Sequence, residues 1–180
     1  MVYVLLGKGF EETEAIAPVD LLRRAGVAVA TVGIGGNVIE GGHGIRVAAD
    51  ISLDQVDTDA MEMIVLPGGL GGVASIQESE KAMALIRYAW ENGRFVAAIC
   101  AGPTVLAALG ITDGVNVTCY PGCESQMGSA RYVAGVPAVT SGRIITGTSA
   151  GCAVSFGLAL VAALKGHDCA DQIARQIVIR

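Results

Sequence analysis

Aromatic and charged residues are scarce in this chain of 180 residues: aromatic residues make up 4% and charged residues 16%. Lysine and arginine number 12 against 17 aspartates and glutamates, which gives a net charge of −5. That balance supplies no basic field for a nucleic-acid backbone or an anionic lipid surface, so we expect neither as a partner. With only five cysteines the chain is not a disulfide scaffold, and its length allows a core without one. We therefore expect one domain over residues 1–180.

Hydrophobic residues are abundant, at 52% of the chain with a mean hydropathy of +0.56. The stretch 144–164 carries no charge and has about the ~20 residues that a membrane-spanning helix needs. However, a Gly/Ser/Thr turn at 147–151 divides it, and no aromatic belt flanks it, so we interpret it as a strand followed by a buried helix and expect no membrane partner. The N-terminus lacks the basic and apolar regions of a signal peptide. We expect a cytoplasmic protein with reduced thiols.

Short apolar runs alternate along the chain with helix-forming segments. The pattern predicts strands at 2–6, 27–32, 63–66, 95–99 and 144–146, and helices at 11–25, 79–91, 102–109, 152–165 and 170–176. It also predicts a small hairpin near 38–47, an irregular stretch at 112–142, and a kink or late start at Pro18 in the first helix. Continuous apolar strands are buried on both faces, which indicates a doubly wound α/β fold with a mostly parallel sheet between helices.

The residues that follow each strand are the candidates for a functional site, because ligands bind at the carboxyl ends of parallel strands. Residues 98–102 (AICAG) fit the nucleophile-elbow pattern, with Cys100 in the nucleophile's place. A helix N-terminus favours the thiolate and predicts a thiol pKa below the ordinary value of about 8.5. The alternative is that Cys100 is an inert buried cysteine that acts as a small hydrophobe.

Two further segments follow strands and carry groups that suit catalysis. Glu14 lies in the first turns of the first predicted helix, and a carboxyl that faces a thiol in an apolar pocket has a raised pKa and can move protons. The alternative is that the glutamates at 11–14 complement the helix dipole in solvent. The glycines at 67–69 (PGG) can supply backbone amides to an oxyanion. No phosphate-binding glycine motif is present, which argues against a nucleotide cofactor.

The remaining histidines and cysteines give weaker signals. His43 and His167 lie in glycine-flanked turns and are expected to be exposed. Cys119 and Cys123 form a Cys-x-x-x-Cys pair with no histidine nearby, which is weak evidence for a metal site. They are ordinary loop thiols or, alternatively, resolve an oxidised Cys100 through a disulfide. The other two cysteines, Cys152 and Cys169, are expected to fill the core or the surface. We expect no metal and no cofactor.

Several of these motifs together resemble the ThiJ/PfpI (DJ-one) superfamily, in its glyoxalase and deglycase branch. The segments 11–14 (EETE), 66–69 (LPGG) and 97–103 (AAICAGP) occur in the family's order, and the likeness extends from residue 2 into the helix near 155–160. The resemblance implies a flavodoxin-like three-layer sandwich and a homodimer. It also implies that Cys100 pairs with Glu14, and that the amides of Gly69 and Ala101 bind an oxyanion.

The resemblance further implies a cysteine-dependent enzyme that acts on small 2-oxoaldehydes such as methylglyoxal, or on their early adducts. The alternative function is an oxidative-stress sensor or chaperone that uses oxidation of Cys100 without turnover, and a third is a binding module with an inert cysteine. Tyr120 stands where members of the family often carry a histidine, and its hydroxyl can donate a hydrogen bond but is no base near neutral pH. Ala101 stands where peptidase members carry a histidine, which argues against proteolysis.

Overall fold

A mostly parallel sheet forms the centre of the computed structural model, which describes residues 1–179. Within this range the sheet has seven strands in the order β10-β11-β7-β6-β1-β2-β5. The strands are β1 (Val2–Leu6), β2 (Val29–Gly33), β5 (Ile51–Ser52), β6 (Met63–Leu66), β7 (Phe95–Ile99), β10 (Ala138–Ser141) and β11 (Ile144–Gly147). All neighbouring pairs are parallel except β10 and β11. The predicted α/β architecture is confirmed.

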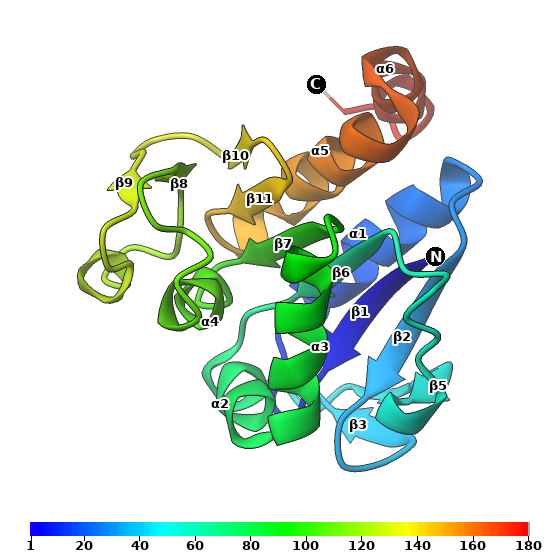
Figure 1. Cartoon of the computed structure of the whole chain (residues 1–180). Helices are drawn as coiled ribbons and strands as arrows, with labels where there is room; N and C mark the ends of the chain where they lie inside the picture. The colour runs from blue at the N-terminus through cyan, green and yellow to red at the C-terminus, as the bar shows by residue number, and fades with distance from the viewer. Residues whose placement is uncertain (180) are drawn as a thin grey trace.

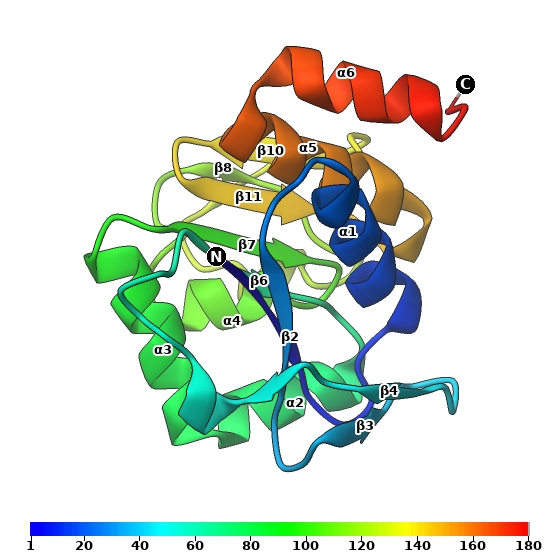
Figure 2. The same ribbon diagram turned by 90° about the vertical axis from the view of Figure 1, so that its right-hand side faces the viewer.

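Helices cover both faces of the sheet (Figures 1 and 2). One layer consists of α1 (Glu12–Arg24), α5 (Ala153–Lys165) and α6 (His167–Gln176), and the other of α2 (Leu70–Glu78), α3 (Glu80–Glu91) and α4 (Pro103–Ala108). Alternate side chains of β1 divide between the layers: Val4 and Leu6 pack into the first, and Tyr3 and Leu5 into the second. Because successive side chains of a strand point to opposite faces, the uninterrupted apolar run of β1 fits burial on both sides.

Short elements lie outside the main sheet. The hairpin β3 (Val38–Glu40) and β4 (Arg46–Ala48) was expected from the sequence, and β8 (Asn116–Val117) with β9 (Arg131–Tyr132) forms a small parallel pair in the irregular stretch. Three 3₁₀ turns complete the described elements, η1 (Leu53–Gln55), η2 (Glu124–Gln126) and η3 (Ala150–Cys152). Within residues 1–179, no helix combines the length and the apolar character needed to cross a bilayer.

The structure differs from the sequence expectation mainly at α2, a segment for which the sequence pattern predicts no helix. Its first turn contains two glycines, which lower helix propensity and hide a helix from pattern analysis. Tertiary packing explains them, because a Cβ at Gly72 would lie 2.7 Å from the Cα of Phe10. The helix α1 continues through Pro18. Gly157 of α5 lies against it, since a Cβ there would come within 3.1 Å of the Pro18 Cα.

Candidate active site

Cys100 occupies a sharp turn between β7 and α4. Its φ of 65° is in the left-handed region, which is uncommon for a residue other than glycine. The backbone is held on both sides: the N–H of Cys100 donates to the carbonyl of Gly147 at 3.0 Å, and its carbonyl accepts from the N–H of Tyr120 at 2.8 Å. At Gly102 a Cβ would lie 2.7 Å from the Leu66 carbonyl oxygen, so the turn needs a glycine there. This is the geometry that a nucleophile elbow requires.

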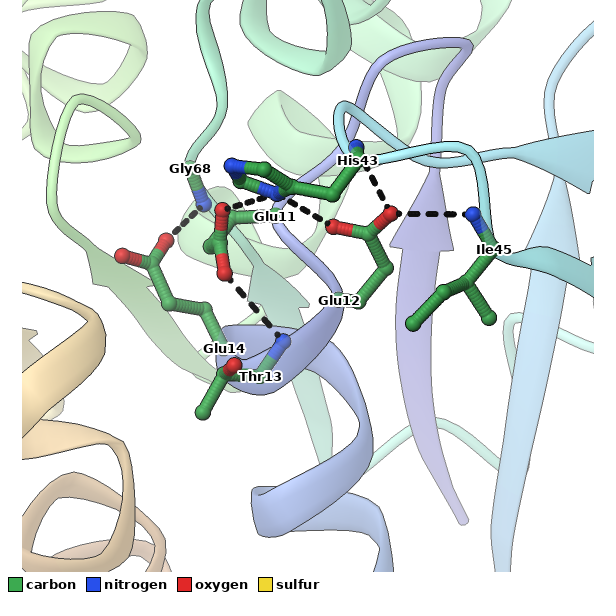
Figure 3. Close-up of polar contacts among 7 residues, drawn as sticks. All are labelled: Glu11, Glu12, Thr13, Glu14, His43, Ile45 and Gly68. Atoms are coloured by element: carbon green, nitrogen blue, oxygen red, sulfur yellow. Dashed lines mark hydrogen bonds and ion pairs between the residues drawn. The ribbon is translucent and has the colours of Figure 1, made fainter.

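Glu14 reaches the same point from α1, near the N-terminus of the chain. Its side chain is 0% exposed, so it does not complement the helix dipole in solvent. One carboxyl oxygen, Oε2, accepts from the N–H of Gly68 at 2.8 Å (Figure 3). The other, Oε1, is buried without a hydrogen-bond partner among the described residues. A Cβ at Gly68 would lie 2.6 Å from Glu14 Oε2 and 2.7 Å from the Cβ of Cys100, so these two side chains converge on one spot.

The two groups shift each other's ionisation. Burial raises the pKa of the Glu14 carboxyl from 4.5 to about 7, although the neighbouring Cys100 thiol and the N–H of Gly68 act in the lowering direction. While Glu14 is ionised, burial and its negative charge raise the pKa of the Cys100 thiol from 9.0 to about 12. When Glu14 instead holds the proton, the repulsion is gone and its O–H can donate to the thiolate, so the pair shares one proton.

The expected lowering of the Cys100 thiol pKa is wrong for the site with an ionised Glu14. From the sequence, the N-terminus of the following helix is expected to lower the thiol pKa. In the structure α4 is only six residues long, and burial is the largest cause of the shift, in the raising direction. The backbone amides of Ala101 and Gly69 act in the expected direction, since their hydrogen bonds to Cys100 lower the pKa of its thiol.

Both amides that the family resemblance assigns to an oxyanion thus face the sulfur of Cys100. Gly69 adopts a φ of 84°, and a Cβ at this position would lie 2.4 Å from the Gly9 carbonyl oxygen. Only glycine fits this close approach, which turns the amide toward the elbow. Two N–H donors on one side of the nucleophile can stabilise an oxygen that becomes negative when a carbonyl is attacked.

A cavity of about 360 Å³ opens beside this group. Its lining includes all five residues named from the sequence, Glu14, Gly69, Cys100, Ala101 and Tyr120. Six further residues line the cavity: Glu11, Leu70, Cys123, Ser149, Ala150 and Gly151. The sequence carries a signal for Ser149, Ala150 and Gly151, because these residues follow β11 at the carboxyl end of the sheet. Glu11 and Cys123 belong to segments that the sequence singles out, the EETE motif at 11–14 and the Cys-x-x-x-Cys pair, but neither pattern by itself places them in this cavity.

A second polar cluster lies next to the cavity at the N-terminus of α1 (Figure 3). The ring Nδ1 of His43 is 2.9 Å from Glu12 Oε2 and 3.2 Å from Glu11 Oε2. Glu12 Oε1 also accepts from the backbone N–H of His43 at 2.8 Å and of Ile45 at 3.3 Å. These contacts lower the pKa of Glu12 to about 2 although burial opposes them. The three side chains could hold a metal ion, but their hydrogen bonds already tie the loop at 41–45 to α1.

The comparisons agree with this fold. The family model described as DJ-1/PfpI family matches residues 1–163, and the chain belongs to that family. It is 36% identical to Protein dj-1beta of Drosophila melanogaster over 98% of this chain and 95% of the relative. It is 31% identical to the glutathione-independent glyoxalase DJR-1.2 of Caenorhabditis elegans, over 94% and 90%. The crystal structure of Drosophila DJ-1beta superposes with a TM-score of 0.93 over 99% of this chain and 97% of that one.

Proposed function

We propose that the protein is a glutathione-independent glyoxalase or deglycase, which converts small 2-oxoaldehydes such as methylglyoxal, or their early adducts, with Cys100 as nucleophile and Glu14 as proton relay. The observation that carries the proposal is the buried carboxyl of Glu14 beside Cys100, with one oxygen unpartnered. A relative 31% identical to this chain is named as a glutathione-independent glyoxalase. The site would use no cofactor.

The first step is addition of the Cys100 sulfur to the aldehyde carbon. A carbon–sulfur bond forms, and the carbonyl π pair moves to the oxygen. The amides of Gly69 and Ala101, which face the sulfur, would stabilise that oxyanion. The proton shared by the pair then passes from Glu14 to the oxygen to give a neutral hemithioacetal. Tyr120 lines the same cavity and would donate a hydrogen bond to the neighbouring ketone oxygen.

The second step moves a hydrogen between adjacent carbons. Glu14, now a carboxylate, removes the proton from the former aldehyde carbon to leave an enediolate, whose negative charge lies on the neighbouring oxygen. It returns that proton to the neighbouring carbon, and the hydroxyl proton of the former aldehyde carbon passes to the neighbouring oxygen. The product is a thioester of a 2-hydroxy acid on Cys100. A carboxyl with a pKa of about 7 suits both directions of transfer, because neither protonation state is strongly favoured near neutral pH. Water then cleaves the thioester, which releases the 2-hydroxy acid and returns the proton and the thiolate to the pair.

The test is formation of lactate from methylglyoxal without glutathione, by the wild-type chain and by Cys100→Ala. Cys152→Ala is the matched control, because Cys152 follows the cavity-lining turn without lining the cavity itself. We expect turnover in the wild type and in the control and none in Cys100→Ala. Equal rates in Cys100→Ala and wild type would end the proposal. In that case, selective oxidation of Cys100 by mild peroxide would favour the sensor function.

A homodimer is part of the same proposal. The side chains of Ile16 on α1, Val38 on β3 and Ile45 in the hairpin loop are all exposed apolar groups. The hairpin loop is hydrogen-bonded to α1 through Glu12, so two of these groups belong to connected elements. Light scattering is expected to give twice the chain mass of 18.3 kDa, and Ile16→Glu is expected to lower it. A monomer in the wild type would refute this part. The cytoplasm is the compartment that keeps such thiols reduced.

A further inference from the structure

A second thiol borders the cavity that contains Cys100. Of the five cysteines, all free thiols within the described residues, only Cys100 and Cys123 line this cavity. The two come from different parts of the fold, the elbow after β7 and the turn that follows β8. Both are partly exposed, whereas Cys119 is 0% exposed. Two accessible thiols that share one cavity can react with the same small molecule, or with each other.

The turn that carries Cys123 is attached to the elbow. The N–H of Tyr120 donates to the carbonyl oxygen of Cys100 itself at 2.8 Å, and the N–H of Cys123 donates to the carbonyl oxygen of Tyr120 at 2.9 Å. Two consecutive backbone hydrogen bonds therefore connect the two cysteines. At the apex, Gly122 is exposed and has a φ of 100°, and a Cβ there would meet nothing within 4 Å. No other part of the protein therefore packs against that side of the apex.

The other three cysteines lack this relation. Cys119 packs with Val117 and Met127 in a small cluster that Cys123 also touches, but Cys119 is 0% exposed and does not line the cavity. The thiol of Cys152 accepts a hydrogen bond from the Ser149 hydroxyl at 3.8 Å and does not line the cavity. Cys169 lies on α6, in the layer of α1 and α5, and does not line the cavity. Among the described residues, Cys123 is therefore the one thiol besides Cys100 that lines the cavity.

We propose that Cys123 is a resolving cysteine, which captures Cys100 as an intramolecular disulfide after Cys100 has been oxidised by hydrogen peroxide or a small organic hydroperoxide. The inference rests on the proposed function only in requiring a reactive Cys100. It adds a reversible off state to the site, because sulfur that is bonded to Cys123 cannot attack an aldehyde.

The disulfide forms in two steps. The Cys100 thiolate attacks the peroxide: the O–O bond breaks, an S–O bond forms, and the leaving oxygen takes the proton held by Glu14, so Cys100 becomes a sulfenic acid. Cys123 then attacks that sulfur: the S–S bond forms, the S–O bond breaks, and the hydroxyl leaves as water with the proton of the Cys123 thiol. Two thiols are oxidised by two electrons and one peroxide is reduced. A dithiol reductant restores both thiols by exchange.

Without Cys123, the sulfenic acid has no thiol partner in the cavity. A second peroxide would convert it to a sulfinic acid, which dithiols do not reduce. The presence of Cys123 therefore decides between recoverable and permanent loss of the nucleophile. A disulfide needs Cα atoms about 4.4–6.8 Å apart, so the turn at 120–123 is expected to close over the cavity as the bond forms.

The experiment treats the full-length chain with a small excess of hydrogen peroxide and follows intact mass and non-reducing peptide maps. We expect the wild type to lose two hydrogens, with Cys100 and Cys123 in one cross-linked peptide pair, and to recover completely in dithiothreitol. Cys123→Ser is expected to gain two oxygens on Cys100 and to resist dithiothreitol. Cys119→Ser and Cys152→Ser, as matched controls, are expected to behave like the wild type.

The result that overturns the inference is a sulfinic acid on Cys100 of the wild type without a cross-link, or a cross-link that maps to Cys119. Lactate formation by the same preparation separates this failure from failure of the proposed function. If the chain turns over methylglyoxal but forms no cross-link, only the resolving role is refuted. If it forms the cross-link but has no turnover, the resolving role stands and the glyoxalase proposal is refuted.

Discussion

The buried carboxyl of Glu14 makes a quantitative prediction about stability. Moving the pKa of this group from its ordinary 4.5 in the unfolded chain to about 7 in the folded chain corresponds to about 3 kcal/mol. Between these two pH values the folded state binds more protons than the unfolded state, so the free energy of unfolding falls as pH rises and levels off above pH 7. Glutamine at this position keeps the size of the side chain but does not titrate.

The cleanest measurement compares Cys100→Ser with the double variant Cys100→Ser/Glu14→Gln, because serine removes the thiol that shares a proton with Glu14. Urea denaturation is followed by circular dichroism from pH 4 to pH 8.5. The free energy of unfolding of the double variant minus that of Cys100→Ser is expected to rise by about 3 kcal/mol from pH 4 to pH 8.5. Other titrating groups contribute equally to the free energy of unfolding of both variants, so their contributions cancel in the difference. A difference that stays constant within about 1 kcal/mol, or that changes in the opposite direction, would refute the argument that burial governs this carboxyl.

Three further predictions concern packing and charge. Gly68→Ala places a Cβ 2.6 Å from Glu14 Oε2 and 2.7 Å from the Cβ of Cys100, and is expected to lower turnover about 100-fold. Gly36→Ala is the control, because a Cβ there would have its nearest atom at 3.9 Å, and it is expected to leave turnover unchanged. Leu6→Ala removes a fully buried side chain and should cost about 3 kcal/mol in urea denaturation, a cost near zero being contrary to the packing described. The hydrogen bond to Glu12 raises the ring pKa of His43 above 6.5. An NMR titration is expected to show that Glu12→Gln lowers it, and an unchanged midpoint would contradict the contact.

Much of the fold could be predicted from the sequence because burial on two faces leaves a direct trace. Runs such as 2–6 and 95–99 are apolar at every position, and they form β1 and β7 in the middle of the sheet. The helix α2 left no such trace. Its glycines reflect contact with the loop at Phe10, and a contact between distant segments has no period along the chain. The antiparallel pairing of β10 likewise depends on which strand is its neighbour.

The candidate active site, like the fold, could be predicted from the sequence only in part. The small residues around Cys100 reveal an elbow because the constraint on that turn is local. Whether Glu14 is a solvated helix residue or a buried partner of the thiol stays open in the sequence, because both place a glutamate in the first turns of a helix. The close approach of Gly68 to both side chains decides it.

By itself, the sequence determined the two-sided burial of the strands and the place of the turn that carries Cys100, because both depend on residues close together in the chain. Only the tertiary structure decided which groups meet at that turn. Glu14 arrives from α1, Cys123 from the turn after β8, and Ser149 from the loop after β11. Their proximity comes from the order of strands in the sheet, which brings distant segments to one edge, and it is this proximity that perturbs the pKa values and places a second thiol beside the first.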